Sequence, residues 1–112
     1  MSLLSWLPGF REAKTIALHA QTLLDRCTHR IDAAMIARSA ELPRAEALGY
    51  LRAKAMHRLV AAISTSGDAA VAAIPSRLHA AVLATAVDRL TSALWRHREQ
   101  RQAVAAPRRR VA

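Results

Sequence analysis

The pair Cys27-x-His29 is the first feature of this sequence that could do chemistry, because thiolate and imidazole groups are common zinc ligands. Two helical residues that are two positions apart point about 200° from each other, so these side chains cannot reach one metal ion. No two histidines have the i, i+4 spacing by which one helix face holds a metal; the five are His19, His29, His57, His79 and His97. We therefore expect no metal and no cofactor, and we expect Cys27 to be a small buried residue.

Acidic residues that could serve as general acids or bases are few. Asp25 and Asp32 are seven positions apart, so a helix would place both on its water-facing side. Glu46 and Tyr50 are four positions apart, a spacing that favours a local hydrogen bond over an acid–base couple. The sequence has no glycine-rich phosphate loop, no nucleophile elbow and no Glu-x-x-His motif. We therefore predict that the protein is not an enzyme.

The basic end of the chain is the clearest candidate for binding. The whole chain has a net charge of +9, and six arginines with a single glutamate lie in residues 96–112. Arginine contacts phosphates, and an exposed tryptophan beside it can stack on bases. The expected contacts to nucleic acid or another acidic partner are Trp95, Arg96, Arg98, Arg101, Arg108, Arg109 and Arg110. Alternatives stay open for both features: the arginine excess reflects GC-rich codon usage, and Trp95 either fills an interface between subunits or packs on the N-terminal segment.

The N-terminal residues 1–10 form a second candidate for binding, because the breaker pair Pro8-Gly9 separates them from the first long helical stretch. Their apolar side chains are Leu3, Leu4, Trp6, Leu7 and Phe10. They either fold back as a lid over one end of the protein or contact a membrane surface or a partner. Basic residues that would support membrane contact are limited to Arg11 and Lys14.

Three long apolar-patterned stretches must position these residues. The middle stretch, residues 44–63, has apolar residues at three- and four-residue steps, within about 120° of one helical face: Leu48, Leu51, Ala55, Leu59, Ala62 and Ile63. A first helix is expected over residues 11–40, with a tight joint at residues 41–43. On the middle helix, His57 shares a side with Tyr50 and Ala53, which is either a second contact surface or a solvated side.

The last stretch begins at Asp68, which is a good N-cap for a helix that starts at Ala69. Pro75 either kinks this helix or divides it into a short helix and a long one that ends at about Ala105. Its apolar stripe drifts from Val82 to Leu90, which indicates a bend or a second packing surface. Beyond Trp95 we expect a solvated extension.

These patterns predict an all-α fold: an antiparallel bundle of three main helices, with a possible short extra helix before Pro75 and a disordered basic tail. The expected division is an apolar segment 1–10, a helical bundle domain 11–106 and a basic tail 107–112. The predicted function is a non-enzymatic module that associates with itself or a helical partner and contacts nucleic acid non-specifically. The alternative is a peripheral membrane protein that uses residues 3–10 and the tail, and an enzyme of unknown type comes third.

The expected compartment follows from the single cysteine and from the lack of a secretory signal or a membrane span in the sequence. A lone cysteine fits a reducing environment, because it forms no disulfide within the chain. We therefore expect a soluble, cytoplasmic protein, and we infer no small-molecule substrate.

Overall fold

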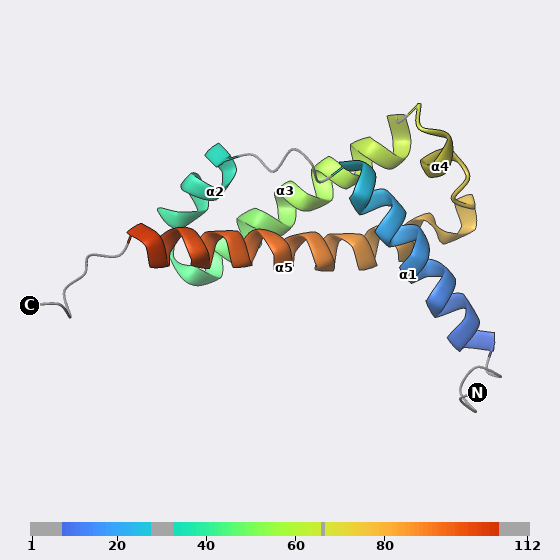
Figure 1. Cartoon of the computed structure of the whole chain (residues 1–112), viewed down its shortest axis with the longest axis horizontal. Coiled ribbons are helices and arrows are strands. Elements are labelled where there is room, and N and C mark those ends of the chain that lie inside the picture. Colours follow the sequence, from blue (N-terminus) through green and yellow to red (C-terminus); the bar gives the residue numbers. More distant parts are fainter. Residues whose placement is uncertain (1–7, 28–32, 66, 106–112) are drawn as a thin grey trace, which may run out of the picture.

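The structure is a computed structural model, and it describes residues 8–27, 33–65 and 67–105. These residues form the helices α1 (Pro8–Cys27), α2 (Ala33–Ala40), α3 (Arg44–Thr65), α4 (Ala69–Ala72) and α5 (His79–Ala105), with one 3₁₀ turn, η3 (Ser76–Leu78). The predicted all-α class is confirmed (Figure 1). None of the described helices combines the length and the apolarity needed to cross a membrane.

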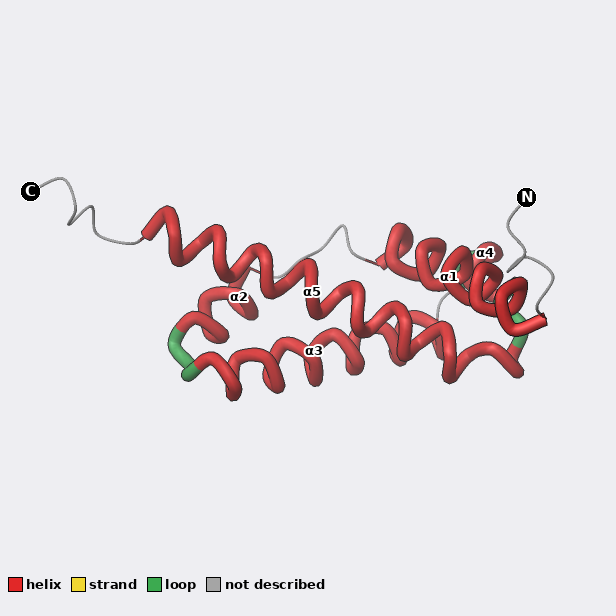
Figure 2. Tube along the Cα trace, turned by 90° about the horizontal axis from the view of Figure 1, so that it is seen from below, coloured by secondary structure: helices red, strands yellow, loops and turns green. Residues whose placement is uncertain are grey.

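The two longest helices, α3 and α5, form the centre of the fold. They run side by side, with α1 packed across α5 near one end and α2 near the other (Figures 1 and 2). Leu51 and Leu59 of α3 are fully buried, as the sequence predicts. They pack in one core with residues of α1, α2, α4, η3 and α5, among them Leu23, Met35, Val71, Leu78, Val82, Leu90 and Leu94.

Leu48 is an exception, and the prediction that it belongs to the core is wrong. Its side chain is 47% exposed, whereas the neighbouring Ala47 is fully buried. The buried side of α3 is therefore rotated in its first turns, toward Ala47. Helical spacing alone assumes a straight buried face and cannot show this rotation.

The expected single helix over residues 11–40 is also wrong, because the chain forms α1 and α2 instead. The axes of the two helices differ in direction, and residues 28–32 between them lie outside the described part (Figure 1). α1 packs on α5, α3 and α4, whereas α2 packs on α3 and α5. The change of direction lets Met35 and Ile36 of α2 reach the core, where both are buried.

Proline residues mark the other boundaries. α1 begins at Pro8, so the expected break between residues 1–10 and the first helix is wrong; proline suits a first helical turn, where its missing N–H is not needed. Pro75 divides α4 from η3 and α5, which settles the alternative that the sequence leaves open.

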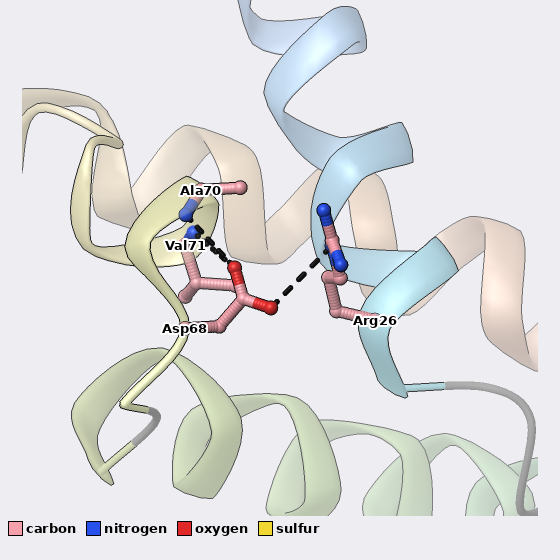
Figure 3. A network of polar contacts seen from close by, with 4 residues as sticks. All are labelled: Arg26, Asp68, Ala70 and Val71. Carbon is pink, nitrogen blue, oxygen red and sulfur yellow. Dashed lines mark hydrogen bonds and ion pairs between the residues drawn. The ribbon is translucent and has the colours of Figure 1, made fainter.

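Asp68 caps α4 as predicted: its carboxylate accepts hydrogen bonds from the backbone N–H groups of Ala70, at 2.8 Å, and Val71, at 3.4 Å (Figure 3).

The Asp68 carboxylate also joins α4 to α1. Its Oδ2 atom lies 3.5 Å from Nε of Arg26, in the last turn of α1 (Figure 3). A positive charge is favourable at the end of a helix and a negative charge at the start of one. Asp68 therefore both caps α4 and joins it to α1.

Candidate functional site

The residues considered for metal binding or catalysis do not form a site in the described part of the chain. No group of three or more His, Cys, Asp or Glu side chains lies close enough there to hold a metal ion. Glu46 and His57 are exposed on α3, and Asp25 accepts a hydrogen bond from Gln21 at 2.7 Å. His29, Asp32 and the side chain of Cys27 lie outside the described residues.

Arg98 is the expected nucleic-acid contact whose role the structure changes most. The expectation that it faces solvent is wrong: the side chain is only 5% exposed. Its Nε donates to the carbonyl oxygen of Ser39 at 3.2 Å, and its Nη2 donates to that of Leu42 at 3.3 Å. These carbonyls lie at the end of α2 and in the joint before α3, where a cation interacts favourably with the helix dipole. Arg98 is therefore a structural residue that joins α5 to α2.

The sequence contains a signal for this role in the spacing of α5. Leu90, Leu94 and Arg98 follow one another at four-residue steps, so Arg98 continues the buried stripe of α5. An arginine can extend such a stripe when its charge finds hydrogen-bond acceptors. The residue type suggests a phosphate contact, but the position in the stripe indicates burial.

Trp95 lies one turn before Arg98 and is half-buried against the core. The two side chains form a cation–π contact, with the Arg98 Cζ atom 4.6 Å from the ring centroid. Arg44, from the first turn of α3, also lies over the ring, at 5.4 Å. Two guanidinium groups of the same chain therefore contact the ring that was expected to stack on bases.

An open groove of about 690 Å³ lies beside Trp95, between the start of α3 and the second half of α5. Its walls are mostly apolar, with two arginines, and consist of Arg44, Ala45, Leu48, Thr91, Ser92, Trp95 and Arg96. The Thr91 hydroxyl is buried and has no hydrogen-bond partner within the described residues. The exposed Leu48 lies in the wall of this groove.

Two residues of the groove wall, Ala45 and Leu48, belong to a set of exposed apolar residues and one glycine on α3. We call this set the α3 face and define it as Ala45, Leu48, Gly49, Met56 and Val60. Its three large side chains, Leu48, Met56 and Val60, are 47%, 41% and 40% exposed, respectively. Gly49 is exposed too, and a Cβ atom built there meets no atom within 4 Å. Its φ angle is not positive, so neither the backbone nor the surroundings within the described chain require glycine. Helical spacing did not reveal this face, because it assigns Leu48 to the core.

The remaining predicted contacts divide into exposed residues and residues outside the described part. Arg96 and Arg101 are exposed on α5. Arg108, Arg109 and Arg110 lie outside the described residues, as do Leu3, Leu4, Trp6 and Leu7. Phe10 lies in α1, but its side chain is also outside the described part. The lid, membrane contact and basic tail therefore stay predictions.

Comparison with known proteins adds no homologue. No protein-family model, no curated protein and no solved structure matches this chain. The candidate surfaces therefore rest on the geometry of the described residues alone.

Proposed function

We propose that this protein is a non-enzymatic assembly module that associates with another helical surface through the α3 face. The observation that carries the proposal is the exposure of Leu48, Met56 and Val60 along one side of a single helix, around a glycine that the chain itself does not need. Scattered exposed apolar residues are ordinary on protein surfaces. Three of them on one helix, one of which lies in the wall of an apolar groove, favour an interaction surface, in which the exposed Arg52 lies between Leu48 and Met56.

The energy available from these three side chains alone is modest. Complete burial of a large aliphatic side chain stabilises by about 1.5–3 kcal/mol, and these three are each a little less than half exposed. Each would therefore contribute about 1 kcal/mol on binding. Association costs about 4 kcal/mol or more of translational and rotational freedom, so a partner must cover all three side chains at once and also make contacts beside them.

The mass of the protein in its native complexes tests this proposal. The protein purified under native conditions from its own cells should exceed the 12.2 kDa of one chain. Met56→Glu should reduce that mass, because it places a charge in the centre of the α3 face. Leu18→Glu is the matched control, because Leu18 is 63% exposed on α1, away from the α3 face.

Unchanged helical circular dichroism would show that both variants fold. A native mass of one chain for the wild type, or an equal loss of mass in both variants, would refute the proposal.

Contact with nucleic acid is a second proposal, supported by the net charge of +9 and by the exposure of Arg96 and Arg101. Arg96 lines the groove beside Trp95, so phosphate contacts would lie next to the α3 face. Arg98 is removed from the set of contacting residues, since its charge is already hydrogen-bonded within the chain. The binding should be weak, salt-dependent and without sequence preference.

A further inference from the structure

We propose that the surface covering the α3 face is the α3 face of a second copy of this chain, packed antiparallel, with Ala45 opposite Val60 and Gly49 opposite Met56. This inference rests on the proposed function and names the partner. It is carried by the order of small and large residues along α3. The small pair, Ala45 and Gly49, lies in the first half of the helix, and the large pair, Met56 and Val60, in the second half.

The two pairs match in spacing and direction. The residues within each pair are four positions apart, which is about 6 Å along a helix. At about 100° per residue, all four lie within a sector of about 60°. A half turn about an axis perpendicular to α3 therefore lays the large pair of one copy on the small pair of the other, and the reverse contact forms at the same time.

Such self-complementarity is what a two-fold interface requires, since the same surface serves both copies. A parallel pair would place Met56 against Met56 and leave a gap between the two Gly49 residues. In the antiparallel pair every large side chain enters a space left by a small one. Leu48 lies about 60° from Ala45, on the groove side of this sector, so it borders the contact, while Met56 and Val60 of each copy are covered.

Gly49 also bears on how closely a second helix can approach. Glycine in the interior of an exposed helix lowers helix stability relative to alanine, and no contact within the described chain compensates for this cost. A second helix can compensate, because helices approach most closely where side chains are smallest. Gly49 thus has a role in the assembled protein that it lacks in the single chain.

The charges at the centre of the interface are compatible with a second copy. The two-fold axis passes between Arg52 and Ala53, which would bring two arginines together. Arg52 already donates to Asp88 Oδ1 at 2.6 Å, so each copy contributes a paired charge and not a bare cation. On the opposite edge of the α3 face, Glu46 of one copy and His57 of the other are offset by about 3 Å along the direction of the helices. At this offset the His57 ring can donate a hydrogen bond to the Glu46 carboxylate.

Disulfide cross-linking of the purified chain in a Cys27→Ser background tests the register. Ala45→Cys and Val60→Cys should cross-link with each other when the two variants are mixed and oxidised. Neither should cross-link alone, because the two copies of either position lie about 22 Å apart along the antiparallel helices. Disulfides require Cα atoms within about 7 Å, so this difference is decisive.

Ala53→Cys, beside the two-fold axis, should cross-link with itself, and Leu18→Cys is the control outside the α3 face. Self-cross-linking of Ala45→Cys would indicate a parallel pair and overturn the inference. Cross-linking of Leu18→Cys that equals that of Ala53→Cys would overturn it too.

Gly49→Leu gives a second measurement that keeps the native cysteine. The added side chain meets open space in the single chain, so the fold should be retained, but it fills the space that Met56 of the second copy would occupy. The association constant, measured by sedimentation, should fall about tenfold or more. Gly49→Ala is the conservative control and should reduce it much less.

A pure wild-type chain that stays monomeric, while native complexes lose mass with Met56→Glu, would overturn this inference and leave the proposed function standing.

Discussion

Replacing Arg98 by alanine should destabilise the protein far more than replacing any exposed arginine of α5. The change removes two hydrogen bonds from a charged donor, to the carbonyls of Ser39 and Leu42, and the contact with Trp95. A hydrogen bond to a charged group contributes about 1.5–3 kcal/mol. We take the low end for each, because Leu42 is half-buried and water can reach its carbonyl once the arginine is gone. With about 0.5–1 kcal/mol for the cation–π contact, the expected loss is about 3.5–4 kcal/mol.

Urea denaturation followed by circular dichroism measures this loss. Arg101→Ala is the matched control, because Arg101 is an exposed arginine on the same helix, and it should change the free energy of unfolding by less than about 0.5 kcal/mol. Arg98→Lys should recover part of the stability, since an ammonium keeps the charge but lacks the planar fork that reaches both carbonyls. Equal effects of Arg98→Ala and Arg101→Ala would refute the conclusion that Arg98 is buried and joins α5 to α2.

Other variants test the core, the cap and the basic end. Leu51→Ala and Leu59→Ala should each lower the free energy of unfolding by about 2–5 kcal/mol, because both side chains are fully buried; unchanged denaturation midpoints would contradict the packing. Asp68→Ala should cost about 1 kcal/mol, whereas Asp68→Asn, which keeps a capping oxygen, should cost less than half of that; equal costs would assign the stability to the partly exposed ion pair with α1, which both variants remove. Replacing Arg96 and Arg101 together by alanine should make the plot of log binding constant for duplex DNA against log salt concentration shallower, by about two in slope. A full-length chain that binds neither DNA nor RNA at low salt would contradict the nucleic-acid proposal.

Local signals in the sequence predicted much of the fold. The helical periodicity of residues 44–63 identified α3, and the capping residue Asp68 identified the start of α4. Pro75 marked a discontinuity, but whether it kinks or divides the helix stayed open in the sequence. Each of these signals depends on residues that are close together in the sequence, so it can be recognised without the tertiary structure. The division of the first helix was not predictable in this way, because it depends on where α3 and α5 lie relative to α2.

The candidate site was harder to predict for the same reason. Leu48 and Arg98 were assigned by residue type and helical angle, and both assignments were wrong. Whether a leucine is covered depends on how far neighbouring helices extend, and whether an arginine is buried depends on acceptors that are distant in sequence. The carbonyls bound by Arg98 belong to residues 59 and 56 positions earlier in the chain. Only the tertiary structure brings them together.

The long sequence distance spanned by Arg98 has a consequence for synthesis of the protein. The ribosome releases α1, α2 and α3 before α5 is complete, so Leu23, Leu51 and Leu59 have no cover from the last helix during that time. The end of α2 and the joint before α3 become fixed only when Arg98 has emerged. Folding of these helices is therefore completed only after α5 has been translated, and a nascent chain stalled before Arg98 should be a substrate for chaperones and proteases.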